Sequence, residues 1–216
     1  KWNDTLYIME EFINGVAVAE TADGKDVLID LEGKEIVPAG KYLSIKRLDI
    51  DSYYFEVRSK ETGKFGLIDG TGNEIIKCEY DSVNVHSSGY RATVFSAEEN
   101  GIVTAYNYNG VKLIDNILAT NFSALGIDIA LDKEGVLKVW DGEIAYFFSE
   151  KTGGLLFTEG KDVEYVDMYN TAGIVKYYDM AQDREVHRLL NEDFTGFVEG
   201  VELPPLSMTN IIRLND

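Results

Sequence analysis

The sequence of this chain repeats itself with a period close to 39 residues, and this repeat constrains the fold more than any other feature. Asp30 and Asp69 are 39 residues apart, and the same interval separates Gly33 from Gly72. Weaker copies continue the series, the first of them around Gly110. A unit this short cannot bury its own apolar face, so tandem copies have to pack against one another. The sequence therefore predicts that one small structural unit recurs along the chain.

Each unit has the composition of short β-strands. Aromatic and β-branched residues occur in runs of about 4–6, bounded by Gly, Asn and Asp. Residues 16–19 and 53–58 are expected to open the first two units, whereas the best helical patterns, at 118–125 and 183–191, are short. The pattern predicts an all-β fold of tandem β-hairpin or meander repeats of about 39–43 residues, forming either a closed small propeller-like ring or an open curved repeat array.

We expect residues 1–216 to form a single repeat domain. A closed ring has no exposed edge strands, whereas an open array needs a polar cap at its end. Residues 203–216, with a last strand at 211–214, are the candidate for such a cap. The expected repeats are about 12–50, 51–88, 89–126, 127–168 and, together with the C-terminal cap, 169–216.

A polar residue followed three positions later by glycine marks a tight turn inside each unit. A side-chain oxygen at the first position accepts hydrogen bonds from the turn's backbone N–H groups, and glycine at the fourth adopts a positive φ at little steric cost. Such turns hold the register of a hairpin. The predicted turn residues are Asp30 and Gly33, Asp69 and Gly72, Asn107 and Gly110, and Gly153 in a weaker fourth copy.

The charge of the chain excludes several kinds of partner. It carries 38 acidic and 20 basic residues, a net charge of −18 at pH 7 with a pI near 4.4. Nucleic acid and anionic lipid both attract clusters of Lys and Arg, so we expect neither as a partner. No apolar run reaches the roughly 18 residues of a membrane helix, and no signal segment is visible in the given chain. The compartment stays open between the cytoplasm and a bacterial cell exterior.

Residues for catalysis or metal binding are scarce. The only cysteine, Cys78, lies on a predicted strand and is expected to be packed and unreactive. His86 and His187 are 101 residues apart, and neither belongs to a catalytic or metal-binding motif. Adjacent carboxylates such as those at 98–99 are expected on the solvated surface, and the acidic group at 128–134 comes nearest to a cation site. We therefore expect no enzyme activity, no cofactor and no metal.

Aromatic residues are the best indication of a binding surface. The chain has 13 Tyr, 10 Phe and 2 Trp, and several predicted strands carry them on both faces. One face has to be core, and an exposed face favours contacts with protein or sugar. The candidate binding residues are Trp140, which precedes a turn, together with Tyr106 and Tyr108. The competing interpretation is that these aromatic side chains fill the space between stacked sheets.

The sequence resembles the WG-repeat family, also called the KWG-repeat family. Residues 12–18 are similar to the opening of its repeat. Residues 64–76 resemble its centre, Lys-aromatic-Gly-apolar-Ile-Asp-x-x-Gly, with Phe65 in the place of the tryptophan. Residues 36–38 and 80–81 are similar to its end in different copies. The resemblance implies a bacterial, all-β tandem repeat without an established activity.

The copies also depart from the family pattern. The first has Asp26-Val27 in place of the aromatic-Gly pair, and the third has Asn107 in place of the aspartate. Taken together, the sequence favours a non-enzymatic binding or scaffold module that contacts another protein, with a basic face, through an acidic, aromatic-rich surface. The alternative is a carbohydrate-binding domain or a carbohydrate-active hydrolase with paired carboxylates, which makes a glycan the other ligand considered.

Overall fold

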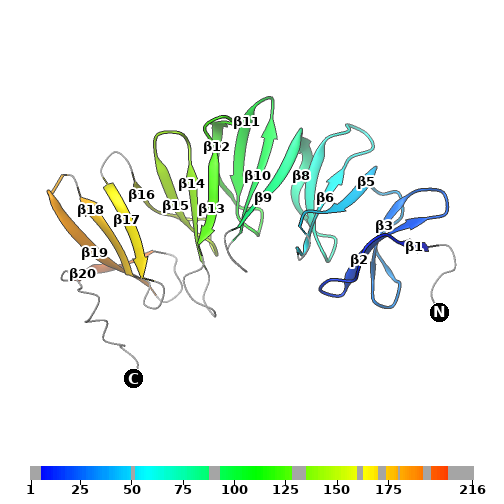
Figure 1. The fold of residues 1–216 in the computed structure, drawn as a ribbon, viewed down its shortest axis with the longest axis horizontal. Helices are drawn as coiled ribbons and strands as arrows, with labels where there is room; N and C mark the ends of the chain where they lie inside the picture. Colours follow the sequence, from blue (N-terminus) through cyan, green and yellow to red (C-terminus); the bar gives the residue numbers. More distant parts are fainter. Residues whose placement is uncertain are drawn as a thin grey trace, which may run out of the picture. The chain divides into compact units, whose positions relative to one another are not determined.

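The computed structural model describes residues 6–49, 52–87, 93–127, 135–159, 163–169, 174–179, 181–191 and 196–203. Within these ranges the chain forms twenty β-strands and no helix (Figure 1). The strands assemble into five four-stranded sheets that follow one another along the chain. The predicted all-β tandem-repeat fold is therefore confirmed. None of the described elements is a helix that could cross a membrane.

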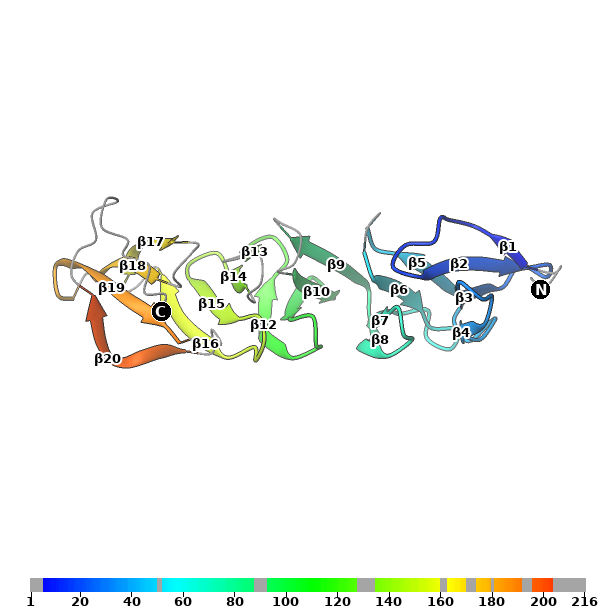
Figure 2. The ribbon, with the colours of Figure 1, turned by 90° about the horizontal axis from the view of Figure 1, so that it is seen from below.

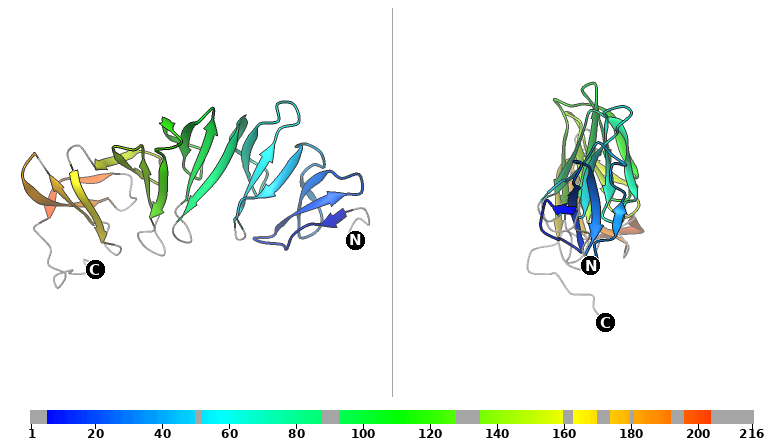
Figure 3. Two further views of the ribbon diagram at one scale, coloured as in Figure 1. Left: turned by 45° about the horizontal axis from the view of Figure 1, so that its top comes forward. Right: turned by 90° about the vertical axis from the view of Figure 1, so that its right-hand side faces the viewer.

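Each sheet is a meander in which consecutive strands are hydrogen-bonded neighbours, a path that can be followed in Figures 2 and 3. The first contains β1 (Leu6–Ile8), β2 (Val16–Thr21), β3 (Asp26–Asp30) and β4 (Glu35–Val37). The second contains β5 (Ser44–Arg47), β6 (Tyr54–Arg58), β7 (Phe65–Asp69) and β8 (Glu74–Tyr80). The third contains β9 (Ser82–Ser87), β10 (Thr93–Glu99), β11 (Ile102–Tyr106) and β12 (Lys112–Leu118). The fourth contains β13 (Ser123–Ile127), β14 (Val136–Trp140), β15 (Ala145–Ser149) and β16 (Leu155–Glu159). The fifth contains β17 (Val163–Tyr169), β18 (Ile174–Asp179), β19 (Arg184–Leu190) and β20 (Phe197–Leu203).

The chain divides into two compact units. The first comprises Lys1–Val85 with Ser96–Ile102, and the second His86–Phe95 with Val103–Asp216. In the first unit, one apolar cluster joins the first and second sheets. Its buried members are Val16, Val18, Leu28, Val37, Ile45, Phe55, Val57 and Ile68. The main cluster of this unit therefore lies between the two sheets, and a smaller one, of Ala19, Val27 and Ile29, lies on the first sheet alone.

In the second unit, the fourth sheet is buried on both faces. One face packs against the third sheet through Leu137, Val139 and Phe148, and the other against the fifth sheet through Val136, Ala145 and Phe147. A strand buried on both faces needs apolar residues at consecutive positions instead of alternating ones. This requirement explains why the strands of this chain contain unbroken apolar runs.

The pairing of the third and fourth strands contains a recurring β-bulge. The register of β3 with β4 shifts between Leu28 and Ile29, and that of β7 with β8 shifts between Leu67 and Ile68. These positions are 39 residues apart in the sequence. A bulge inserts one extra residue and increases the local twist. The sequence period therefore corresponds to a repeated backbone geometry as well as to a repeated strand order.

The sheets do not begin where the sequence repeats are expected to begin. Residues 16–19 and 54–58 belong to the second strand of their sheets, because β1 and β5 precede them. The second sheet accordingly begins at Ser44. The short helical patterns at 118–125 and 183–191 fall on strands and on the turn between β12 and β13.

Two expected features lie outside the described residues. They are the acidic group at 128–134 and, beyond Leu203, the C-terminal cap with its strand at 211–214.

Candidate interaction surface

The turn between the third and fourth strands has the same hydrogen bonds in the first three sheets. Asp30 Oδ1 accepts the backbone N–H groups of Glu32 at 3.0 Å and Lys34 at 2.8 Å. Asp69 Oδ1 accepts the N–H groups two and four residues further on at 2.8 and 3.0 Å. Asn107 Oδ1 does the same at 3.0 and 2.9 Å. One side-chain oxygen therefore satisfies two backbone donors in each turn.

The glycines of these turns adopt the left-handed conformation. Gly33, Gly72 and Gly110 have φ angles of 78°, 83° and 75°. In the fourth sheet the turn is one residue longer, because Gly153, with φ of 70°, donates its N–H to the main-chain oxygen of Ser149 at 2.8 Å. Residues with a Cβ rarely adopt such angles, so glycine is required at these positions by the backbone itself.

Two of the turn glycines lie directly against the preceding sheet. A Cβ at Gly72 would meet the Cγ2 atoms of Ile36 and Val37 at 3.3 Å each. A Cβ at Gly153 would meet Val111 Cγ1 at 2.8 Å. The turn residues therefore belong to the framework that sets the approach of successive sheets within each unit.

The third and fourth sheets are also joined by a buried polar contact. Asn107 is fully buried, and its Nδ2 donates to the main-chain oxygen of Glu150 at 2.9 Å. The buried Glu150 carboxylate accepts the backbone N–H groups of Gly135 at 2.6 Å and Thr93 at 3.3 Å. A buried carboxylate is costly unless such donors replace water, so these contacts fix the two sheets together.

The Lys-aromatic-Gly and Tyr-Asp segments of the second repeat meet in space. Lys64 Nζ lies 2.7 Å from Asp81 Oδ1 and 3.3 Å from Glu99 Oε1. The hydrogen bond from Lys64 lowers the pKa of the Asp81 carboxyl below its ordinary value. Gly66 is needed because the backbone of β8 crosses it, so that a Cβ would lie 2.6 Å from the main-chain oxygen of Ile76. These motif residues are therefore structural.

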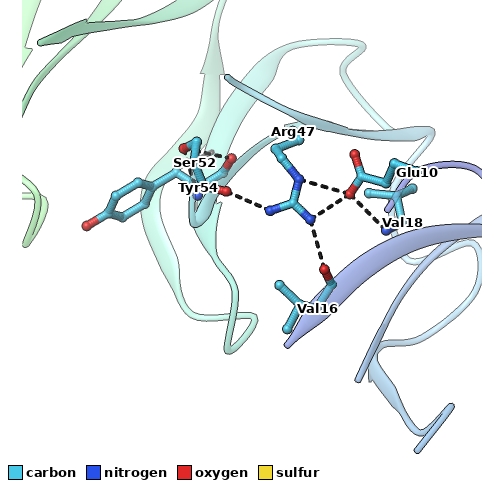
Figure 4. Close-up of polar contacts among 6 residues, drawn as sticks. All are labelled: Glu10, Val16, Val18, Arg47, Ser52 and Tyr54. Atoms are coloured by element: carbon cyan, nitrogen blue, oxygen red, sulfur yellow. Dashed lines mark hydrogen bonds and ion pairs between the residues drawn. The ribbon is translucent and has the colours of Figure 1, made fainter. Parts of the chain in front are cut away.

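A buried arginine that no sequence pattern indicated joins the first and second sheets (Figure 4). Arg47 Nε and Nη2 donate to Glu10 Oε1 at 3.0 and 2.7 Å. Its other hydrogen bonds reach the main-chain oxygens of Val16 at 2.9 Å and Ser52 at 2.6 Å. Glu10 Oε1 also accepts the N–H of Val18 at 3.1 Å. The fixed fork of guanidinium donors suits this multiple contact, which a lysine cannot reproduce.

The three candidate binding aromatics are all partly buried. Trp140, at the end of β14, packs against the apolar cluster between the fourth and fifth sheets. Tyr106 is the last residue of β11, and Tyr108 lies in the following turn, on the other side of Asn107. The two tyrosines therefore share one turn of the third sheet, and the tryptophan belongs to the fourth.

The remaining reactive groups, Cys78, His86 and His187, lie on three different strands, β8, β9 and β19. Cys78 is half-buried on β8, and burial raises the pKa of its thiol. Burial lowers the pKa of His86, whose ring packs edge-on against Phe122 with centroids 5.3 Å apart. His187 is buried, with Nε2 2.9 Å from a carboxylate oxygen of Glu185. Over the part of the chain that the structure describes, no group of three His, Cys, Asp or Glu side chains is placed to hold a metal ion.

One edge of the first sheet is an exposed apolar strand that no sequence pattern indicated. Tyr7, Ile8 and Met9 are 62%, 47% and 60% exposed. They lie in and just after β1, one of the two edge strands of the first sheet, and no other described strand pairs with its outer edge. An apolar run on a short strand is typical of core, so only the three-dimensional position of this strand identifies it as surface.

Five consecutive four-stranded meanders with shared turns and bulges define an all-β tandem-repeat protein. Residues 65–94 match the family model described as a WG containing repeat. The match begins at the first residue of β7 and ends in β10. One sequence repeat therefore combines the last two strands of one sheet with strands of the next. The resemblance to WG-repeat proteins is confirmed for this segment.

No curated protein matches the chain. Solved structures similar to it include BBS1N in complex with ARL6DN, at 16% identity over 89% of this chain and 62% of that chain, with a TM-score of 0.30. They also include the WD40 domain of SCAP from fission yeast, which is 12% identical over 93% of this chain and 56% of that chain, with a TM-score of 0.29. BamB from Moraxella catarrhalis is 14% identical over 82% of this chain and 55% of that chain, with a TM-score of 0.31. The chain spans less than two thirds of each of these three structures.

Proposed function

We propose that this chain is a non-enzymatic scaffold module that binds another protein through its acidic repeat surface. The supporting observation is that its polar groups have two separate roles. Those at the turns and sheet joints, including Asp30, Asp69 and Asn107, are occupied by backbone N–H groups. Other carboxylates of the described residues are exposed on the surface, and the chain as a whole has a net charge of −18.

The charge determines what kind of partner fits. Exposed carboxylates occur on turns of both units, for example at Glu32, Glu61 and Glu143. A negative surface attracts a protein with a basic face from a distance, which raises the association rate at low ionic strength. Salt screens this attraction, because the Debye length falls to roughly 8 Å at physiological ionic strength.

A titration tests this function. Fluorescein-labelled cationic peptides are titrated with the full chain at low and high salt, and peptides of equal length without net charge are the control. We expect binding of the cationic peptides that weakens about tenfold or more between low and high salt. Binding that ignores ionic strength, or that does not distinguish the two peptide sets, would contradict a charge-steered protein interaction.

A second candidate function is carbohydrate binding or hydrolysis. It is favoured by the partly buried Trp140 next to Asp141, whose carboxylate accepts a hydrogen bond from Tyr146 Oη at 3.0 Å. An aromatic ring beside a fixed polar group is suited to a sugar. A glycan array probed with the chain and with Trp140→Ala tests binding, and a glycan-hydrolysis screen tests turnover. Glycan binding that Trp140→Ala abolishes would support this second function.

A further inference from the structure

The edge of the first sheet differs from the corresponding edges of the next three sheets. The first strands β5 and β9 expose the polar residues Lys46 and Asn84, with an exposed leucine, Leu43, just before β5, and β13 exposes Ser123 as well as Leu125. By contrast, the β1 edge, defined here as residues 6–9, exposes three consecutive apolar side chains. Polar or charged residues on an edge strand prevent pairing with other chains. Among these four first strands, only β1 exposes no polar or charged side chain. The β1 edge therefore lacks this protection against pairing.

The backbone of the β1 edge presents hydrogen-bonding groups away from its own sheet. The N–H of Met9 donates to the main-chain oxygen of Val18 at 3.0 Å, so Met9 faces β2. Tyr7 is paired with Glu20 and faces the same way. Alternate residues of an antiparallel strand bond to the same neighbour. The N–H and C=O groups of Ile8 therefore point outward, where an additional strand would bond.

The surroundings of this edge are acidic. Residues 6–21 contain three glutamates and no Lys or Arg. Glu10 is neutralised by Arg47, but Glu11 is exposed and Glu20 lies opposite Tyr7. Pairing with the same strand of a second copy would bring like charges together, whereas a basic segment is attracted.

We propose that the β1 edge binds an extended segment of a partner protein that carries apolar and basic side chains, as an added strand of the first sheet. This proposal rests on the proposed function and specifies the chemistry of its partner. Main-chain hydrogen bonds to Ile8 align the segment, as in other cases of β-strand addition. Its apolar side chains cover Tyr7, Ile8 and Met9, and its basic side chains approach Glu11 and Glu20.

Two substitutions at Ile8 test the proposal. The probe is a fluorescein-labelled peptide of alternating valine and lysine, titrated with the full chain and followed by anisotropy. Ile8→Pro removes the outward N–H but leaves the bonds of the neighbouring residues to β2. Ile8→Lys places a charge on the edge strand that opposes pairing with another strand. It is the second test variant, which keeps the test valid if the proline variant does not fold. Leu155→Lys is the matched control, because Leu155 is also an exposed apolar residue on a strand.

We expect both Ile8 variants to bind the peptide about tenfold more weakly, and Leu155→Lys to bind as the unmodified chain does. Amide hydrogen exchange at Ile8 should slow about tenfold when the peptide is bound, which a purely electrostatic contact would not produce. If all variants bind cationic peptides equally, or exchange at Ile8 is unchanged, the β1 edge proposal is wrong and the proposed function stands. If the unmodified chain binds no cationic peptide, both fail.

Discussion

The buried side chain of Asn107 donates a hydrogen bond from Nδ2 to the main-chain oxygen of Glu150, 43 residues further along the chain, at 2.9 Å. At the equivalent positions of the first two sheets, Asp30 and Asp69 accept the same kind of turn N–H groups. An ionised carboxylate accepts hydrogen bonds but cannot donate one. The third repeat therefore departs from the family's aspartate for a structural reason, since only an amide satisfies both the turn and the neighbouring sheet.

Replacing this amide by a carboxylate tests that explanation. Asn107→Asp keeps the acceptor for the turn but places a buried negative charge against the main-chain oxygen of Glu150. We expect the free energy of unfolding to fall by about 2–4 kcal/mol, because a buried group loses its partner and a charge is desolvated. Urea denaturation measures the change. Asn109→Asp is the control, because Asn109 is exposed and its own contact with the main-chain oxygen of Lys151 is long, at 3.5 Å; an equal loss in both variants would contradict the explanation.

The close approach of β8 to Gly66 leads to a second prediction. A Cβ at this position would lie 2.6 Å from Ile76 O and 2.7 Å from Cys78 N, and backbone atoms cannot move aside as a side chain can. We expect Gly66→Ala to reduce the free energy of unfolding by about 1–3 kcal/mol, the range typical of overpacking. Thermal unfolding followed by circular dichroism measures it. In Gly196→Ala the added Cβ has 4.0 Å to its nearest neighbour, so stability should be nearly unchanged.

The parts of the fold that could be predicted from the sequence are those encoded by short-range patterns. The turn at Asp69 and Gly72 depends on residues only three positions apart, and its recurrence after 39 residues identified the repeat. By contrast, β5 was not expected, because Ser44–Arg47 contains one apolar residue among polar ones. Such a strand is stabilised by pairing with β6, and this partner is not visible in a local window.

The sheet joints were missed for a related reason. Arg47 is bonded to a glutamate 37 residues away, and Asn107 to a residue 43 away. Neither separation produces a local pattern, and both side chains belong to types that are usually exposed. The β1 edge is the opposite case, because its apolar residues are typical of a buried core but are exposed in the structure. In each case the location of a side chain depends on which sheet packs next to it.

The contact between Arg47 and Glu10 leads to a third prediction. Arg47→Lys keeps the charge but loses the planar fork that reaches Glu10, Val16 and Ser52 at once. We expect the free energy of unfolding to decrease by about 2–4 kcal/mol, since removing one partner leaves a partly buried charge and two main-chain oxygens without a donor. A double-mutant cycle with Glu10→Gln isolates the pair. A coupling energy near zero would show that the contact contributes nothing.

The pH dependence of stability leads to the last prediction. The hydrogen bond from Lys25, with a smaller one from Thr21, lowers the pKa of Asp23 to about 2. An unfolded aspartate titrates near pH 3.9. Because the folded pKa is the lower one, the stabilisation is fully present above about pH 4 and is lost as the pH falls towards 2.

Asp23→Asn should therefore lower the melting temperature at neutral pH, and the difference from the unmodified chain should shrink between about pH 4 and pH 2. Thermal melts over this range at constant ionic strength measure it. In a Lys25→Met background the same substitution should lose most of its pH dependence, because Lys25 is the main cause of the shift. A difference that grows as the pH falls would mean that the Asp23 carboxylate is held in its neutral form by the fold, which is the opposite of what this ion pair requires.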